Sequence, residues 1–427
     1  MEYIADIHFH SKYAGACSDQ LVLENIDKAV KEKGVGIVGT GDFTHPLWMK
    51  EIKEKLEGDN GIYRLKGSDT GTRFLITTEV ATIFSKDSSV TSRGVFDRSG
   101  NVKKIHHVIM APNVEAAEQL NKELARFGNL SLDGRPQLNM SAAELADIAF
   151  GVDKGMFLYP AHAWTPWFGV LGSISGFDSV EDAYEDQAKH IYAIETGLSA
   201  DPAMIWRVSK LDRYALLSSS DAHSLPKIGR EAVIMDIDGE LTYAKMTGAI
   251  KEKRLKMTVE FYPEEGKYHY DGHRNCKVSM PPSESNKFNG ICPVCRKKLT
   301  LGVMHRVEDL ADREEGYRPS GAVPFVNAIP LQEVIAHVLK KTTTSPYVLR
   351  AYDKLVTAFG SEFNVLLRGD VERIREVDKE TGDAIESVRE NRVHIIPGYD
   401  GVFGIIDIAN EIKERKGQNG QSRISDF

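Results

Sequence analysis

Two short stretches, Asp6-Ile7-His8-Phe9-His10-Ser11 and Ser219-Ser220-Asp221-Ala222-His223-Ser224, decide the fold of this chain. Each follows a short apolar run that is typical of a β-strand. Residues two apart on a strand point to the same face. His8 and His10 can therefore bind one metal ion together, and so can Asp221 and His223. Imidazole and carboxylate groups on rigid strands suit zinc, manganese or iron.

More residues of these types follow other apolar runs between the two stretches. They are Asp42 and His45 after residues 37–41, Glu79 after 74–78, His106 and His107 within 105–110, His162 after 156–161 and Glu195 after 191–194. Helical stretches at 21–33, 114–126 and 141–150 separate the runs. This alternation predicts a parallel, barrel-like α/β domain whose polar residues gather at one mouth. Because His106 and His107 point to opposite faces of a strand, at most one of them faces that mouth.

The simplest alternative treats each of these residues as structural. A single histidine after a strand is most often structural, and one His-x-His pair is a weak signal. Seven or more ligand-type residues at successive strand ends are much harder to explain in this way. They favour a polynuclear metal site, which is a common device for phosphodiester hydrolysis.

The order of motifs over residues 1–235 resembles the PHP (polymerase and histidinol phosphatase) family. The motifs are H-x-H-S, G-T-G-D, T-E, H-H-V, A-H and S-S-S-D-A-H. The resemblance implies a distorted (β/α)7 barrel with two or three divalent metals (Zn, Mn or Mg) at its mouth. Its ligands would be His8, His10, Asp42, His45, Glu79, His107, His162, Asp221 and His223. Most members read T-D-H where this chain reads Thr40-Gly41-Asp42-Phe43-Thr44-His45, so the histidine is displaced by two.

In this scheme His8, His10, Glu79 and Asp221 form one metal site and are the catalytic residues. Glu79 bridges to a second metal held by His107 and His162, and His223 with Asp42 or His45 completes a third. The metals activate a water for in-line attack on phosphorus. Candidate substrate-binding residues are Lys227 and Arg230 for the phosphate and Trp164 and Trp167 for a flipped base. The alternatives are a surface role for the two cations and packing at the rim for the two tryptophans.

The bulk properties exclude several classes of protein. A length of 427 residues predicts two or three domains. We expect no transmembrane helix and no membrane partner, because no stretch of 18 apolar residues exists. The absence of a signal peptide and the presence of only four cysteines favour a reducing, cytoplasmic compartment. A net charge of −8 argues against a uniformly basic nucleic-acid binder but permits a local basic surface.

A second metal site is predicted after the barrel. His273-Arg274-Asn275-Cys276 and Cys292-Pro293-Val294-Cys295 have the layout of a small zinc ribbon that binds one structural zinc. His269 is the rival to His273 for the fourth position, and the matching spacing favours His273. Residues 267–306 hold eight basic and two acidic side chains, a net charge of +6 that suits a phosphate backbone.

The last residues match a known type of peptide. Gln421, Ile424 and Phe427 fit the Q-x-x-h-x-x-a pattern of peptides that bind the sliding clamp (PCNA). Ile424 and Phe427 lie on the same side of a helical turn, where both can enter an apolar pocket. A tail that matches by chance is the alternative.

The expected domains are thus a PHP barrel (1–255), a zinc-binding module (256–312), a mainly helical region (313–410) and a flexible tail (411–427).

Over essentially its whole length the chain is similar to the archaeal endonuclease Q family. The barrel motifs, the zinc ribbon and Gly398-Tyr399-Asp400-Gly401 carry this similarity. It implies a metal-dependent DNA repair endonuclease, at the nucleoid, that nicks on the 5′ side of deaminated bases (hypoxanthine, uracil, xanthine) or abasic sites. A PHP phosphatase for a small metabolite would leave the zinc ribbon and the C-terminal region unexplained. A non-catalytic scaffold with a relic metal site would be missing ligands.

Overall fold

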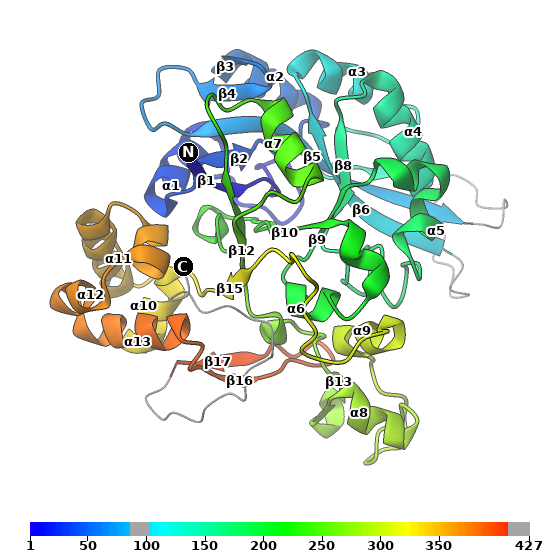
Figure 1. The fold of residues 1–427 in the computed structure, drawn as a ribbon, viewed down its shortest axis with the longest axis vertical. Helices are drawn as coiled ribbons and strands as arrows, with labels where there is room; N and C mark the ends of the chain where they lie inside the picture. Colours follow the sequence, from blue (N-terminus) through cyan, green and yellow to red (C-terminus); the bar gives the residue numbers. More distant parts are fainter. Residues whose placement is uncertain (86–101, 409–427) are drawn as a thin grey trace.

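The computed structural model describes residues 1–85 and 102–408. Its largest part is a mixed α/β unit around an eleven-stranded sheet, so the expected α/β class is confirmed (Figure 1). The strands of this sheet are β1 (Glu2–Asp6), β2 (Ile37–Gly39), β3 (Leu56–Asp59), β4 (Ile62–Leu65), β5 (Arg73–Ser85), β6 (Val102–Ala111), β7 (Gln137–Leu138), β8 (Phe157–Pro160), β11 (Ala232–Asp236), β12 (Met257–Glu260) and β15 (Phe325–Asn327). Strands β9 (Ala193–Glu195) and β10 (Ala215–Leu217) form a separate parallel pair.

Backbone hydrogen bonds bring the ends of these strands around one centre. The amide of Ala163, just after β8, donates to the carbonyl of Glu195 in β9 over 2.9 Å. The amide of Asp221, after β10, donates to the carbonyl of His8, after β1, also over 2.9 Å. The residues that follow β1, β8, β9 and β10 therefore meet at the same place. The expected number of seven barrel strands stays a prediction.

The expectation of a parallel domain is wrong at β6. This strand runs antiparallel to both of its neighbours, β5 and β8. Strands β5 and β6 are the two arms of one long hairpin, paired from Ile76 opposite Ala111 to Ser85 opposite Val102. Among the described residues no helix separates β5 from β6, whereas consecutive parallel strands are usually joined by a helical crossover.

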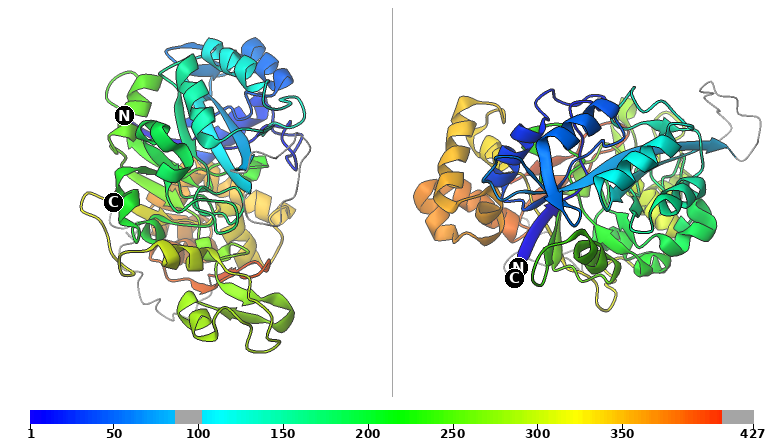
Figure 2. Two further views of the ribbon diagram at one scale, coloured as in Figure 1. Left: turned by 90° about the vertical axis from the view of Figure 1, so that its right-hand side faces the viewer. Right: turned by 90° about the horizontal axis from the view of Figure 1, so that it is seen from above.

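Helices cover the outside of the sheet (Figures 1 and 2). They are α1 (Leu23–Lys33), α2 (Pro46–Lys55), α3 (Val114–Leu124), α4 (Ala142–Val152), α5 (Val180–Tyr184), α6 (Pro202–Ile205) and α7 (Tyr243–Lys251). Local signals fix their ends. Ser141 and Glu144 form a capping box at the start of α4, and Gly34 ends α1 with a φ of 83°. The apolar faces of the helices bury Val30, Leu120 and Leu145 in the core.

The chain leaves this sheet and returns to it beyond the expected boundary at residue 255. Strands β12 and β15 both belong to the large sheet and pair with each other in parallel. Between them lies a small module with β13 (Asp271–His273), β14 (Val278–Met280), α8 (Pro282–Ser285) and α9 (Val303–Leu310). It projects from one end of the molecule (Figure 1). The expected zinc-binding module is therefore inserted between two sheet strands.

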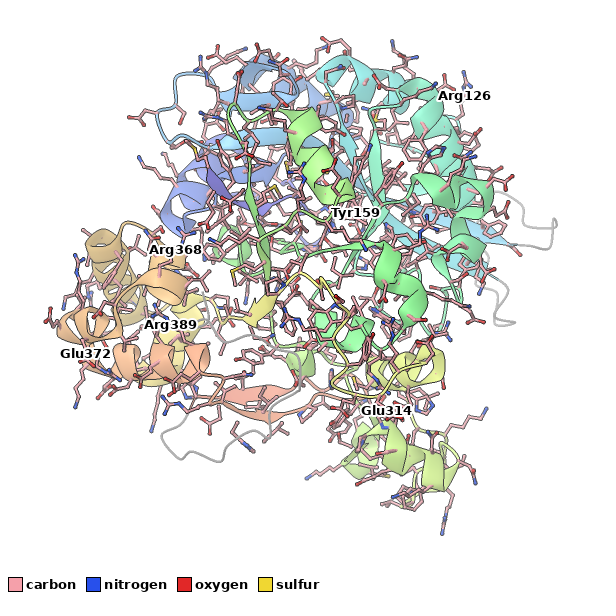
Figure 3. The ribbon with its side chains drawn as sticks, viewed as in Figure 1. Arg126, Tyr159, Glu314, Arg368, Glu372 and Arg389 are labelled. Atoms are coloured by element: carbon pink, nitrogen blue, oxygen red, sulfur yellow. The ribbon has the colours of Figure 1, made fainter. Side chains whose placement is uncertain are left out.

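The C-terminal region is mainly helical, with α10 (Leu331–Leu339), α11 (Pro346–Phe359), α12 (Val371–Val377) and α13 (Lys379–Arg389). These helices bury Val334, Ile335 and Leu355 in a core of their own. Figure 3 marks this region by Arg368, Glu372 and Arg389, well away from Tyr159 of β8 in the middle of the molecule. The hairpin of β16 (His394–Ile396) and β17 (Ile405–Asp407) runs from the helices toward the zinc-binding module (Figure 1). No helix within residues 1–85 and 102–408 is long and apolar enough to span a membrane.

A buried ion pair joins the C-terminal helices to the α/β unit. The ammonium of Lys33, at the end of α1, lies 2.7 Å from the carboxylate of Glu362, and their side chains are only 6% and 5% exposed. Glu362 also accepts hydrogen bonds from the hydroxyl of Tyr352 and the amide of Leu331. Lys33 donates to the carbonyl of Pro226. Each buried charge therefore has its opposite charge only while the C-terminal helices are packed on the α/β unit.

We expect Glu362→Ala to lower the free energy of unfolding by about 3–5 kcal/mol, because it leaves the Lys33 charge buried without its partner. Chemical denaturation followed by tryptophan fluorescence measures the loss. The matched control is Glu54→Ala, which removes the partner of Lys50 in an ion pair whose side chains are 59% and 70% exposed. That change should cost about 0–1 kcal/mol. Equal losses of unfolding free energy in the two variants would show that the Lys33–Glu362 pair does not stabilise the fold as a buried pair.

Candidate metal centre

Four predicted ligands converge at the mouth of the α/β unit. His8 and His10 follow β1, Glu79 lies in β5, and Asp221 follows β10. One ligand atom from each lies within 4.8 Å of all the others. The Nε2 atom of His10 is 3.1 Å from Glu79 Oε2 and 3.3 Å from Asp221 Oδ1. The structure thus brings together the four residues expected to form the first metal site.

The facing atoms of this group do not satisfy one another. His8 Nε2, His10 Nε2 and Asp221 Oδ1 are buried and have no hydrogen-bond partner among the described residues. Buried polar atoms in proteins are normally paired, and each exception needs an explanation. Two imidazole nitrogens and carboxylate oxygens that point at one centre form a donor set for a divalent cation. The residues present therefore fit a metal at this position.

A second layer of carboxylates fixes which ring nitrogen faces the centre. His8 Nδ1 lies 3.1 and 3.0 Å from the two carboxylate oxygens of Glu195. His10 Nδ1 lies 2.9 Å from Asp42 Oδ1. Each Nδ1–H donates to its carboxylate, which leaves the Nε2 lone pair free to bind metal. This carboxylate–histidine arrangement is the usual support of a metal-binding histidine.

A second group shares Glu79. The carboxylate of Glu79, the imidazole of His106 and the imidazole of His162 also offer ligand atoms within 4.8 Å of one another. Glu79 Oε1 is 2.7 Å from His106 Nδ1 and 3.1 Å from His162 Nε2. Since Glu79 Oε2 faces the first group, its two oxygens can serve two neighbouring cations.

The structure corrects the choice between the paired histidines of β6, because His106 and not His107 faces the centre. In the β5–β6 register His106 lies opposite Ala81, which points to the same side of β5 as Glu79. His107 lies opposite Val80 and points the other way. Its nitrogens contact the hydroxyls of Tyr184 and Thr82 at 2.7 and 2.8 Å. His107 is therefore a hydrogen-bonded core residue.

The residues expected to hold a third metal are not assembled in the same way. Asp42 uses Oδ1 for His10 and Oδ2 for the amide and hydroxyl of Ser11. It is buried and fully engaged, so it orients His10 and does not itself face the centre. His45 instead stacks on Tyr13, with ring centroids 4.3 Å apart. Of the three expected ligands of the third metal, His223 lies near the first ligand group, with its ring centroid 4.8 Å from that of His10.

Three residues of the centre have a left-handed backbone. The φ angles of Asp42, His162 and Asp221 are 48°, 27° and 45°. Non-glycine residues seldom adopt this conformation, and it persists only where the surroundings impose it. Here the amide of His162 donates to Glu195 over 2.8 Å, which helps to hold that turn. The strand ends thus turn sharply, so that His162 and Asp221 reach the centre and Asp42 reaches His10 behind it.

Burial and charge set the protonation of these groups. Burial would raise the pKa of Glu79, but the surrounding imidazoles, first His106 and then His8, hold it well below its usual range. Burial lowers the pKa of His8, but Glu195 and Glu79 outweigh it and raise that pKa well above its usual value. Glu79 is therefore an ionised buried carboxylate that needs positive charge beside it.

Sequence reasoning missed the cation beside Glu79. Arg135 lies on the loop between α3 and β7, and its guanidinium is 3.3 Å from Glu79 Oε2. No strand-end pattern marks this residue, because it sits in a loop between Gly134 and Pro136. Glu195 follows the pattern, but its role as the partner of His8 depends on contacts that only the folded chain shows.

The four expected substrate-binding residues have other contacts. Lys227 pairs with Glu333 at 2.5 Å, and Arg230 donates to the carbonyls of Ser220 and Asp221 at 2.8 and 3.4 Å. Trp164 is fully buried, so it packs in the core. Trp167 is 43% exposed and meets the edge of Tyr268 from the zinc-binding module. Their substrate contacts stay predictions, and the contacts of Arg230 favour a structural role.

The small module brings together its four expected ligands. His273, Cys276, Cys292 and Cys295 offer ligand atoms within 4.8 Å of one another, and Cys295 Sγ is 3.4 Å from His273 Nδ1. His273 rather than His269 belongs to this group. Three thiols and one imidazole with no further ligand suit a closed, structural zinc site.

The two histidines of β6 give a matched test of the second ligand group. We expect His106→Asn to lower the bound metal, because it removes one of three ligands, and His107→Asn to retain the metal. Elemental analysis of the purified proteins measures metal per chain. His107→Asn should still destabilise the fold, since it disturbs contacts with Tyr184 and Thr82. Loss of metal in His107→Asn but not in His106→Asn would show that His107 is the ligand instead.

We expect Cys292→Ser to lose one zinc equivalent per chain, because a structural site needs all four ligands. Cys17→Ser is the matched control, since Cys17 lies outside the ligand group and should leave the zinc content unchanged. Elemental analysis against protein concentration reads out both variants. An unchanged zinc content in Cys292→Ser would show that the ligands are misassigned.

Comparisons with known proteins place the chain among a small set of relatives. A family model described as the MJ0043 C-terminal domain matches residues 330–392. The uncharacterized protein MJ0043 of Methanocaldococcus jannaschii is 29% identical over 251 residues, which are 57% of this chain and only 31% of that protein.

Two solved structures match the fold along the whole chain. The lesion-specific endonuclease PfuEndoQ from Pyrococcus furiosus is 30% identical, with a TM-score of 0.84 and coverage of 97% of this chain and 98% of that chain. An endonuclease Q in complex with a 27-mer duplex substrate, which carries an abasic lesion at the active site, is 29% identical. Its TM-score is 0.82, and the match covers 100% of both chains.

Proposed function

Because this chain belongs to the endonuclease Q family, we propose that it is a metal-dependent DNA repair endonuclease. It nicks the phosphodiester bond on the 5′ side of a deaminated base (hypoxanthine, uracil or xanthine) or of an abasic site. The observation that carries this proposal is the pair of ligand groups that share Glu79 at the mouth of the α/β unit. Such a chain would act in the cytoplasm, at the nucleoid.

The chain's own residues prepare the centre for this reaction. Divalent cations bound there would supply Lewis-acid stabilisation of the negative charge that develops on the phosphate. Glu195 and Asp42 hold His8 and His10 with their Nε2 atoms toward the centre. Glu79 offers one oxygen to each ligand group. Burial of these groups excludes bulk water and strengthens every charge interaction.

The basic residues of the inserted module are proposed to hold the DNA backbone. Residues 267–306 carry the net charge of +6, and phosphate contacts of this kind make affinity fall steeply with salt. Arg306 is an exception, because it pairs with Asp178 at 2.6 Å and donates to the carbonyls of Leu171 and Phe177. It joins the module to the α/β unit and is not free to bind phosphate.

The alternative, a phosphatase for a small metabolite, is less well supported. It would use the centre but give no role to the basic inserted module or to the C-terminal helices. The sliding clamp (PCNA) is a further proposed partner. Its expected contacts, Gln421, Ile424 and Phe427, lie outside the described residues, so this partner depends on the sequence pattern alone.

A nicking assay tests the proposed function. Duplex oligonucleotides that carry hypoxanthine, uracil, an abasic site or no lesion are incubated with Mg²⁺, Mn²⁺ or Zn²⁺, and the strand is sized on a denaturing gel. We expect a cut on the 5′ side of the lesion and none in undamaged DNA. Chelation should abolish the cut, and Asp221→Asn should slow it by roughly a hundredfold or more, since it removes a ligand charge.

Glu54→Ala is the matched control, because it removes an exposed carboxylate that belongs to no ligand group and should leave the rate unchanged. Hydrolysis of a small phosphate monoester without any cut in lesion DNA would support the phosphatase instead. A cut in lesion DNA that survives chelation would contradict the metal mechanism.

A further inference from the structure

Leu132 is a solvent-exposed apolar side chain on the loop whose Arg135 contacts Glu79 of the metal centre. Its exposed fraction is 80%, the highest among the large apolar residues of the part of the chain that the structure describes. It lies within the loop of residues 129–135, between α3 and β7. Arg126, labelled in Figure 3, marks the chain shortly before this loop begins. Scattered exposed leucines are common on proteins, so the surroundings of this one decide whether it has a role.

The loop around Leu132 is tied by its own side chains. The carboxamide of Asn129 accepts from the amide and hydroxyl of Ser131 at 3.0 and 2.7 Å. The carboxylate of Asp133 accepts from the amide of Arg135 at 2.9 Å and from the amide of Gly15 at 3.3 Å. Hydrogen bonds thus brace the loop on both sides of Leu132. The backbone on either side of Leu132 is therefore held in place.

The same loop is anchored to the metal centre. The amide of Gly134 donates to the carbonyl of Tyr13, and its carbonyl accepts from the hydroxyl of Thr44 at 3.2 Å. A Cβ atom at Gly134 would lie 2.5 Å from the carboxylate of Asp42, the partner of His10. Arg135 reaches Glu79. The residues that follow Leu132 are therefore tied to the centre by hydrogen bonds and close packing.

We propose that Leu132 is the wedge that enters the base stack when this enzyme extrudes a damaged nucleotide. An enzyme that acts on a nucleotide in duplex DNA must take it out of the stack. Leu, Ile, Met and Phe are the side chains that proteins insert between base steps, because they replace part of the lost stacking contact without a polar group to desolvate. The loop holds such a side chain outward while Arg135, three positions later, touches the catalytic carboxylate.

This inference depends on the proposed function and deepens it, because a wedge matters only for a lesion inside a duplex. A lesion in single-stranded DNA is already unstacked. The two substrates therefore separate a role in extrusion from a role in chemistry, which would affect both alike.

The test compares single-turnover nicking of one hypoxanthine-containing strand, alone and annealed to its complement. We expect Leu132→Ala to slow nicking of the duplex at least tenfold and to leave nicking of the single strand within twofold of the wild type. Leu132→Met should restore duplex nicking, since it keeps an apolar wedge. Leu349→Ala, at a 41% exposed leucine of α11, is the matched control and should change neither rate.

A second readout follows extrusion without cleavage. In an Asp221→Asn background, 2-aminopurine placed next to the lesion should brighten when the protein binds the duplex. With Leu132→Ala added, it should stay quenched. Equal slowing of both substrates by Leu132→Ala, or unchanged duplex nicking, would overturn the wedge. A wild-type protein that nicks neither substrate would instead overturn the proposed function, and the wedge with it.

Discussion

The buried charge of Glu79 is the constraint on which the rest of this structure depends. An ionised carboxylate out of water is tolerated only with positive charge or donors around it. Here His8, His10, His106 and His162 surround it from three segments of the chain, and Arg135 approaches from the loop between α3 and β7. The nitrogens of His8 and His10 that face it are left without hydrogen-bond partners. A divalent cation would satisfy these atoms, and this supports the assignment of the group as a candidate metal centre.

Strained backbone turns and buried carboxylates hold the side chains of this centre in place. Asp42, His162 and Asp221 all turn in the left-handed region just where a strand ends. Glu195 joins two of the converging segments, because it accepts from the ring of His8 and from the amide of His162. Such outer contacts orient the ligands in advance and reduce the cost of binding metal and substrate.

The remaining parts of the chain are positioned around the centre by specific polar contacts. The zinc-binding module emerges between two strands of the sheet and is secured by Arg306 on Asp178. The C-terminal helices are secured by Lys33 on Glu362 and by Lys227 on Glu333. These ion pairs couple each part to the α/β unit. Lys227, expected at the phosphate, thus serves the interface between two parts of the chain.

The sequence by itself determined the kinds of ligand and the strand ends that carry them, because the two-residue period of a strand is a local property. It located His8, His10, Glu79 and Asp221 in this way, and it located the four ligands of the small module by the spacing of a zinc ribbon. Only the tertiary structure decided that His106 and not His107 faces inward, since that depends on the register of β6 against β5. It alone decided that Asp42 supports His10 and that Arg135 reaches Glu79. Those roles arise from contacts between segments distant in the chain, which no local pattern encodes.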